Sequence, residues 1–203
     1  EERSCYLVIN VVSSFGFNGW KEYARDFVNT WVQFWPLDVK LRVYYHDCVL
    51  PEDAPQALNV EYFNLNEVSE DMVAFKAKFS NAHGKNDKGV YDFRKDAIKF
   101  CHKVFAIGHS AKALIDKTDW LVWLDADTLT KEMVSRDDLN AVLPTDGAIV
   151  YLGRKGTFLE SSFLALNFTD ENALDFIADL LDIYKTGELF NYTEWHDGFV
   201  IQR

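Results

Sequence analysis

Two segments of this sequence are largely apolar and rich in β-branched or aromatic side chains, and they constrain the fold more than any other feature. The first is Cys-Tyr-Leu-Val-Ile-Asn-Val-Val at residues 5–12, and the second is Trp-Leu-Val-Trp-Leu at residues 120–124. Such strands are typical of parallel sheets that helices cover on both faces, because a half-exposed strand alternates apolar with polar residues. The two segments therefore predict a buried sheet.

The rest of the chain alternates between helical and extended patterns. Residues 20–35 place aromatic side chains at helical spacing, and Pro36 ends this expected helix. Further strands are expected at residues 39–45, 60–65, 148–152 and 162–167, and further helices at 70–80, 92–115, 170–185 and from Asp197 onward. This order contains neither repeats nor low-complexity segments, and it predicts an α/β fold with a mostly parallel central sheet flanked by helices.

Length and charge narrow the class of protein. The 203 residues fit a single domain, residues 1–203. Because the sequence begins at Glu1, we expect this domain to be trimmed at both ends. The 32 acidic residues outnumber the 21 basic ones, which gives a net charge of −11 and argues against nucleic-acid binding and polybasic membrane docking. No apolar run reaches the ~18 residues of a membrane span. The cysteines Cys5, Cys48 and Cys101 form no CxxC pair, so a reducing, cytoplasmic location is expected.

Polar and acidic side chains follow three of the expected strands. Ser13 and Ser14 follow the first strand in a small polar loop, Asp47 follows the second, and Asp125 and Asp127 follow the strand at residues 120–124. In open α/β sheets, ligands bind beyond the carboxyl ends of the strands. These ends therefore predict a binding site at one edge of the sheet.

Asp125 and Asp127 give the sharpest signal for chemistry. Two carboxylates at the tip of a buried strand repel each other, and a divalent cation such as Mg²⁺ or Mn²⁺ relieves that repulsion. A solvated turn with two exposed acids stays open as the alternative, although the buried strand before the pair favours the metal. An EF-hand is excluded because Thr130 and Arg136 stand where its loop needs Gly and Glu. The DxDxT pattern of haloacid-dehalogenase phosphatases is not met either, because Leu129 occupies its Thr position.

Several segments together resemble nucleotide-sugar glycosyltransferases of the GT-A fold, in particular bacterial and phage members with a DxD motif. They are the Ser-Ser loop after the first strand, the Asp that closes the second strand, Trp-Leu-Asp-Ala-Asp at residues 123–127, and the stretches 91–106, 153–163 and 194–199. The resemblance spans nearly the whole chain. It implies a GT-A-like, Rossmann-like nucleotide-binding sandwich. It also implies metal-dependent, hexosyltransferase-type transfer from a Leloir donor, a UDP-sugar above all, to a glycan or other hydroxyl acceptor.

The resemblance also implies roles for individual residues. Asp125 and Asp127 would hold Mn²⁺ or Mg²⁺, and His196 would add a metal or phosphate contact. The positions implied for the nucleotide-sugar donor are Val12, Ser13, Ser14, Phe15, Asp47, Arg94, Lys103, Asp125 and Arg154. Asp197 and Glu160 are the candidates on the acceptor side, where a carboxylate would take the proton of the acceptor hydroxyl.

Structural roles stay open for some of these residues. Lys103 lies on a partly apolar helix stripe, where a lysine can keep its charge in water. Asp197 could cap the helix that follows it, and His196 could pack against Trp195. The histidines His46, His83, His102 and His109 lie in no metal-binding pattern and receive no role.

Two other functions also stay open at this stage. One is a haloacid-dehalogenase-like phosphate hydrolase with Asp125 as its nucleophile. The other is a nucleotide-sugar binding module without turnover, because a fold alone does not establish catalysis.

Overall fold

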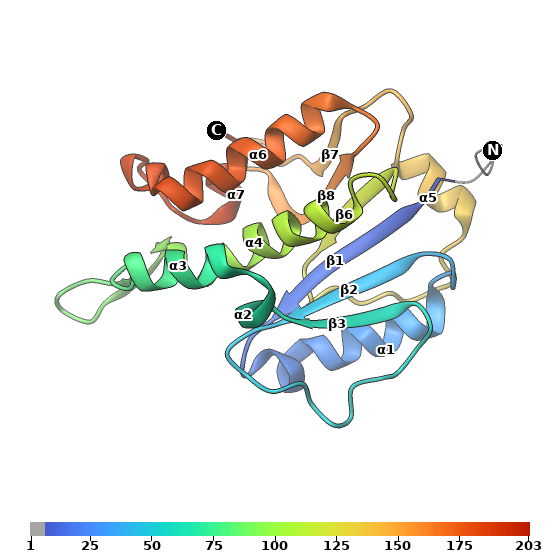
Figure 1. The fold of residues 1–203 in the computed structure, drawn as a ribbon, viewed down its shortest axis with the longest axis horizontal. Coiled ribbons are helices and arrows are strands. Elements are labelled where there is room, and N and C mark those ends of the chain that lie inside the picture. Colours follow the sequence, from blue (N-terminus) through green and yellow to red (C-terminus); the bar gives the residue numbers. More distant parts are fainter. Residues whose placement is uncertain (1–6) are drawn as a thin grey trace.

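The computed structural model describes residues 7–203 (Figure 1). Its strands are β1 (Ile9–Phe15), β2 (Lys40–Tyr45), β3 (Val60–Asn64), β4 (His83–Lys85), β5 (Tyr91–Asp96), β6 (Trp120–Leu124), β7 (Ile149–Leu152) and β8 (Glu160–Asn167). Its α-helices are α1 (Arg25–Phe34), α2 (Leu65–Val68), α3 (Glu70–Lys78), α4 (Ala97–Leu114), α5 (Arg136–Val142), α6 (Glu171–Thr186) and α7 (Asp197–Ile201). A π-helical segment, Trp20–Ala24, leads into α1, and a 3₁₀ segment, Glu188–Asn191, follows α6.

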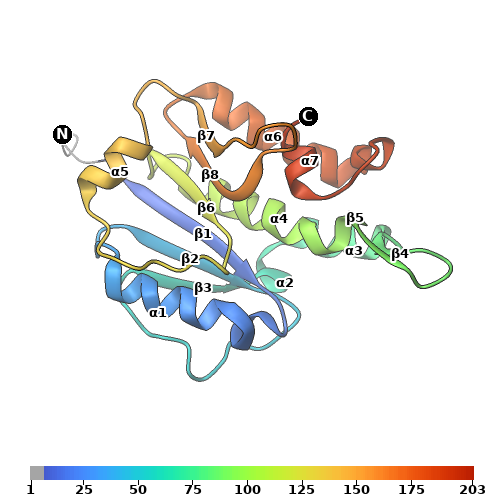
Figure 2. The same cartoon turned by 180° about the vertical axis from the view of Figure 1, so that it is seen from behind.

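The central sheet has six strands in the order β3-β2-β1-β6-β8-β7. β1 runs parallel to β2 and β6, and β2 runs parallel to β3, whereas β8 is antiparallel to both of its neighbours. The prediction of a mostly parallel sheet flanked by helices is confirmed. Because β1, β2 and β6 point the same way, their carboxyl ends lie at one edge of the sheet (Figures 1 and 2).

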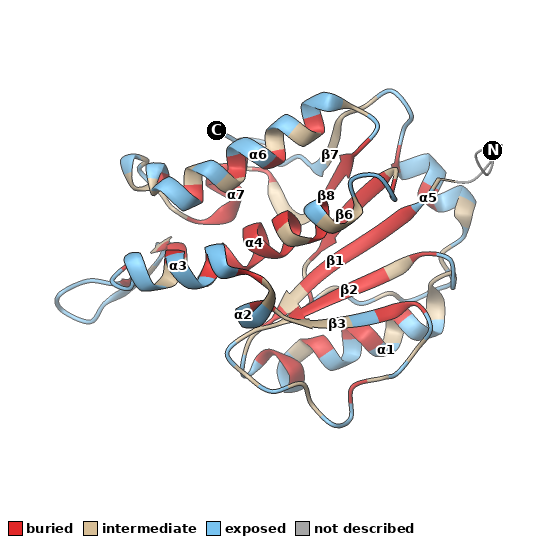
Figure 3. Cartoon of the chain, viewed as in Figure 1, coloured by how far each residue is buried: buried red, intermediate tan, exposed pale blue. Residues whose placement is uncertain are grey.

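Helices cover both faces of this sheet. α3, α4 and α6 pack on one face, together with the side chains of Val12, Leu121 and Trp123, and α1 and α5 pack on the other. Successive side chains of a strand point to opposite faces, so β1 and β6 contribute to both cores, and Figure 3 shows these strands as buried almost throughout. Each large apolar side chain buried in this way contributes about 1.5–3 kcal/mol to folding.

The first strand differs from its expected bounds. It continues to Phe15 and includes Ser13 and Ser14, for which the sequence predicts a loop; the loop begins at Gly16. Ser13 and Ser14 therefore occupy the end of the pleated strand, where β1 still pairs with β2. The beginning of the expected strand, Cys5 with its neighbour, lies outside the described residues.

The long helix α4 begins later than the sequence indicates. Residues 92–96 belong to β5, which pairs with β4 in a separate two-stranded sheet. The change to helix occurs at Asp96, whose side chain accepts a hydrogen bond from the Lys99 N–H at 2.9 Å and caps the helix. The β4–β5 hairpin is therefore separate from α4, the helix that carries Lys103.

No helix in residues 7–203 combines the length and the apolar composition that a bilayer crossing requires. Cys48 and Cys101 are free thiols. Cys5 lies outside the described residues.

Candidate active site

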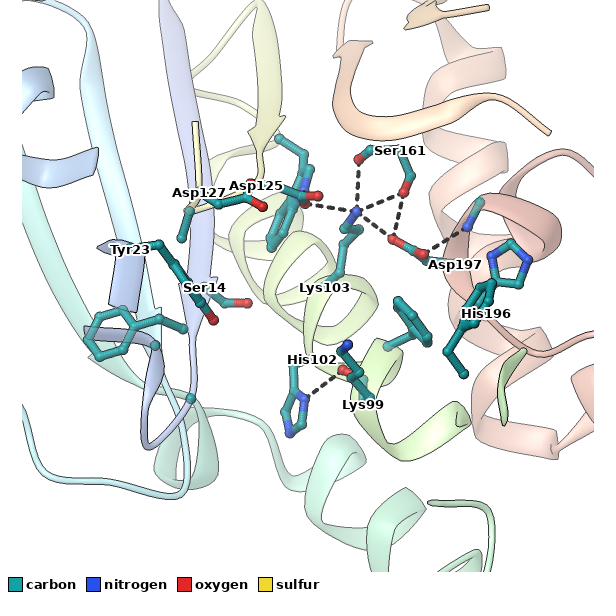
Figure 4. A pocket seen from close by; sticks show the side chains of 18 of the residues that line it. Ser14, Tyr23, Lys99, His102, Lys103, Asp125, Asp127, Ser161, His196 and Asp197 are labelled. Carbon is teal, nitrogen blue, oxygen red and sulfur yellow. Dashed lines mark hydrogen bonds and ion pairs between the residues drawn. The ribbon is translucent and has the colours of Figure 1, made fainter. Parts of the chain in front are cut away.

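A cavity of about 900 Å³ opens at the carboxyl edge of the sheet (Figure 4). Its wall is formed by the loop after β1, the turn after β6, the first half of α4, the segment before β8 and the start of α7. The predicted site residues in this wall are Ser14, Phe15, Lys103, Asp125, Asp127, Arg154, Glu160, His196 and Asp197. The structure thus gathers side chains from distant parts of the chain around one space.

Four predicted residues do not line this cavity. Val12 is fully buried in the core, and the hydroxyl of Ser13 donates to the backbone oxygen of Leu124 at 2.6 Å, which ties β1 to β6. Arg94 lies in the exposed hairpin, and its guanidinium donates two hydrogen bonds to Asp92, each at 2.9 Å. Asp47, the fourth, does not line the cavity, but it contacts His46 and His102, which do.

Asp125 is anchored by two neighbours. Its Oδ1 accepts a hydrogen bond from Trp123 Nε1 at 2.6 Å and lies 3.0 Å from Lys103 Nζ. Trp123 stands two residues before Asp125, and side chains two residues apart in an extended segment point to the same face. Burial raises the pKa of Asp125, and Lys103 and the indole only partly counter this, so that the net shift is upward.

Lys103 is the central charge of the site (Figure 4). Its ammonium forms ion pairs with Asp125 and Asp197 and donates to the backbone oxygen and hydroxyl of Ser161 at 2.8 and 3.1 Å. Burial disfavours its charge, but the two carboxylates outweigh burial and raise its pKa. The sequence-level alternative, a lysine whose charge stays in water, is wrong because the side chain is only 8% exposed.

Asp197 is buried and fully engaged. Besides Lys103, it accepts hydrogen bonds from the Ser161 hydroxyl and from the Gly198 N–H, both at 2.9 Å. Burial alone would raise the pKa of Asp197, yet Lys103 and these hydrogen bonds lower it overall. Asp197 is the first residue of α7, so the cap belongs to the residue before it.

His196 caps α7 in place of Asp197. Its Nδ1 accepts the Phe199 N–H at 3.3 Å, and its Nε2 lies 3.0 Å from a carboxylate oxygen of Glu194. The ring also packs against Phe93 and Phe158 at centroid distances of 5.5 and 4.9 Å. Both ring nitrogens are therefore engaged.

Asp127 is the exposed member of the acidic pair. In the described part of the chain, no side chain forms a hydrogen bond or an ion pair with its carboxylate, and no hydrogen bond is made to Oδ2 of Asp125. Tyr23 lies nearby, and its pKa is raised by burial and by the charges of Glu22, Asp127 and Asp125. Two carboxylates with unengaged oxygens are a donor set that fits a hard divalent cation.

The cavity wall carries more acid than base. Its carboxylates are Glu22, Asp125, Asp127, Glu160 and Asp197, whereas its cations are Lys99, Lys103 and Arg154. Arg154 pairs with Glu160, and Lys103 pairs with two aspartates. Among the described residues, Lys99 is the cavity cation without a carboxylate partner, and the sequence analysis missed it. Its spacing of four residues from Lys103 on one helix was the available signal.

A cluster of two histidines was also missed. Ligand atoms of His46, Asp47 and His102 lie within 4.8 Å of one another, so these residues could hold a metal ion. The imidazoles stack at 3.5 Å, however, and Lys76 Nζ lies 2.7 and 2.9 Å from the two carboxylate oxygens of Asp47. The ammonium of Lys76 thus already supplies the cation of this cluster.

Burial disfavours the charged form of both imidazoles. Burial lowers the pKa of His46, and burial together with the charge of His46 lowers that of His102 to about 3. Both rings line the cavity. The sequence does not indicate this pair, because His46 follows β2 and His102 lies on α4, and only the fold brings the two rings together.

Solved structures of glycosyltransferases share this architecture. Mouse xyloside xylosyltransferase 1, in its apo form, matches with a TM-score of 0.56 and 10% identity over 96% of this chain and 80% of its own. The apo form of the glycosyltransferase GlyE from Streptococcus pneumoniae TIGR4 matches with a TM-score of 0.51 and 11% identity, over 95% of this chain but 41% of GlyE. No protein-family model and no curated protein matches the sequence. The chain therefore has a GT-A-like glycosyltransferase fold.

Proposed function

We propose that this protein is a glycosyltransferase. It transfers a sugar, of the hexosyl type, from a nucleotide-sugar donor, a UDP-sugar above all, to a hydroxyl acceptor such as a glycan, with the help of Mn²⁺ or Mg²⁺. The observation that carries the proposal is the position of Asp125 and Asp127, at the carboxyl edge of the sheet and in the wall of a cavity of about 900 Å³. Cavities of roughly 300–1,000 Å³ are typical of small-molecule and cofactor sites.

The charge of the cavity supports the need for a metal. With five carboxylates against three cations in the wall, an anionic diphosphate would meet an excess of negative charge. A divalent cation held by Asp125 and Asp127 would offset that excess and stabilise the charge that develops on the leaving diphosphate. Two side chains cannot fill about six coordination positions. His196 would add a ligand only after its Nε2 leaves Glu194.

The donor would be held by groups around this pair. Ser14 and Phe15 face the cavity from the end of β1, and Lys99 offers an unpaired charge to the diphosphate. Arg94 would take part only after it releases Asp92. Asp47 would act through His46 and His102, which it contacts.

On the acceptor side, Glu160 is the better candidate for the proton acceptor. Its side chain is 32% exposed at the cavity, beside Arg154. The lowered pKa of Asp197 makes that carboxylate a weak base. We therefore propose that Asp197 chiefly holds Lys103 and that Glu160 faces the acceptor hydroxyl.

Calorimetric titration of UDP tests the metal and the nucleotide together. UDP is titrated into the wild type and Asp127→Asn, each with Mn²⁺ and with EDTA, and Asp146→Asn serves as control because Asp146 is an exposed acid outside the cavity. Removing the metal or its ligand is expected to weaken UDP binding by about 10- to 100-fold, which corresponds to about 1.5–3 kcal/mol for interactions with a charged group. Asp146→Asn is expected to bind UDP like the wild type.

The release of nucleoside diphosphate from a panel of UDP- and GDP-sugars then tests turnover. Equal UDP affinity under all conditions would remove the metal site. Metal-dependent UDP binding without release from any donor would favour the binding module. Hydrolysis of simple phosphate esters that is lost in Asp125→Asn would favour the phosphate hydrolase.

A further inference from the structure

The carboxylate of Asp125 is held at one oxygen only. Trp123 Nε1 donates to Oδ1 at 2.6 Å, and Lys103 Nζ lies 3.0 Å from the same atom. Within residues 7–203, no hydrogen bond to Oδ2 is formed. The backbone is fixed as well, because the Asp125 N–H donates to the Ser162 oxygen at 2.9 Å.

The two groups that hold Oδ1 also contact each other. Lys103 Nζ lies 5.1 Å from the centroid of the Trp123 ring, so the ammonium and the indole N–H converge on one oxygen. Both residues are buried, Trp123 at 3% and Lys103 at 7% exposure. Trp123 is fixed by the strand and Lys103 by Ser161, so neither is free to follow a moving carboxylate.

We propose that Trp123 and Lys103 position Asp125 by binding Oδ1, which leaves Oδ2 as the oxygen that coordinates the metal. The inference rests on the proposed metal site. Trp123 is then a positioning residue, since it acts on the metal through Asp125. Outer partners of this kind fix the orientation of a ligand, and their loss typically costs 10- to 100-fold in metal affinity.

The substitution Trp123→Phe removes the indole N–H and keeps an aromatic ring in the core. Mn²⁺ affinity is measured by electron paramagnetic resonance of free Mn²⁺, without nucleotide. The dissociation constant of Trp123→Phe is expected to rise about 10- to 100-fold over the wild type.

Trp20→Phe is the matched control. Trp20 is 4% exposed, and its Nε1 donates to a carboxylate oxygen of Asp53 at 2.8 Å, which is the same kind of bond in a residue that does not line the cavity. Its Mn²⁺ affinity is expected to equal that of the wild type. An equal loss in both variants would show a general effect of removing a buried indole and would overturn the inference.

A second measurement needs no variant of Trp123 and stands even if Trp123→Phe fails to fold. Titration with Mg²⁺ is expected to shift the indole N–H resonance of Trp123, assigned by through-space couplings, because its acceptor carboxylate gains a metal. The resonance of Trp20 is expected to stay in place. A Trp123 resonance that does not respond to Mg²⁺ would overturn the inference.

The outcomes also separate this inference from the proposed function. If Asp127→Asn weakens Mn²⁺ binding and Trp123→Phe does not, the metal site stands and the positioning role is wrong. If neither Asp125→Asn nor Asp127→Asn changes Mn²⁺ binding, the metal site itself is wrong, and with it the basis of the positioning role.

Discussion

The substitution Lys103→Met is expected to have the largest effect on stability of any single change in the site. Lys103 lies between Asp125 and Asp197, and the side chains of Lys103 and Asp197 are only 8% and 5% exposed. Methionine keeps most of the apolar stem but leaves the carboxylate of Asp197 buried without a cation. Breaking a buried pair in this way costs about 3–5 kcal/mol, because the remaining charge is uncompensated.

Thermal and urea unfolding measure this cost. For a chain of this size, each kcal/mol corresponds to about 2–4 °C, so Lys103→Met is expected to lower Tm by roughly 6–20 °C. Lys99→Met removes the same charge from an exposed position of the same helix and is expected to stay within about 0.5 kcal/mol of the wild type. The double variant Lys103→Met/Asp197→Asn removes both charges and is expected to recover part of the loss.

The stability of this pair also has a predictable pH dependence. The pKa of Asp197 is lowered, since Lys103 outweighs burial, so its contribution is present above the unfolded value of about 3.9 and is lost as the solution is acidified. The pKa of Lys103 is raised, since the carboxylates outweigh burial, so its contribution is present below about 10.4 and is lost at more alkaline pH. In the wild type, the pair is therefore expected to stabilise the fold most between the two unfolded pKa values, from about pH 4 to about pH 10. A cost below about 1 kcal/mol at pH 7 would refute the argument that Lys103 compensates two buried charges.

Three further predictions concern the wall of the cavity. Lys99→Met is expected to weaken UDP binding in the presence of Mn²⁺ by about tenfold, measured by calorimetry, because an unpaired cation is lost from the proposed diphosphate site. Glu160→Gln is expected to lower sugar transfer by roughly 10²-fold or more with little change in UDP affinity, whereas Asp197→Asn should lower transfer and Tm together; unchanged transfer in Glu160→Gln would exclude it as the base. Lys76→Met is expected to destabilise the fold by about 0.5–1 kcal/mol at pH 7, because Asp47 is partly exposed, and urea titrations should show that this difference fades below about pH 4. That direction follows because Lys76 and its neighbours outweigh burial and hold the pKa of Asp47 below its usual range.

The fold could be predicted well from the sequence where burial dominates. The strand at residues 120–124 has the expected bounds because a short run of five apolar residues, two of them Trp and one Val, suits a strand covered on both faces. The helix expected at residues 92–115 begins five residues late because residues 92–96 pair with β4. Helical periodicity does not distinguish this hairpin, since strand pairing depends on a partner elsewhere in the chain.

The position of the site was likewise accessible, because the carboxyl ends of β1 and β6 had to meet at one edge of the sheet. The hydrogen-bond partners within it were not. His196, rather than Asp197, caps α7, and Trp123 holds Asp125 through an indole N–H. These pairings depend on side-chain rotamers and on how closely α4 approaches the sheet, which no spacing in the sequence specifies.

The pairing of Lys103 follows from charge once this lysine is known to be buried. Lys103 shares a helix stripe with Phe100 and Ile107, and a lysine on a face that packs against a sheet is stable there only if carboxylates neutralise it. The carboxylates that neutralise Lys103 stand at the ends of elements: Asp125 follows β6, and Asp197 is the first residue of α7. Because a buried ammonium needs counter-charges to stay protonated, the burial of Lys103 explains the contacts that join α4, the turn after β6 and α7, whereas the sequence left open whether this lysine is buried.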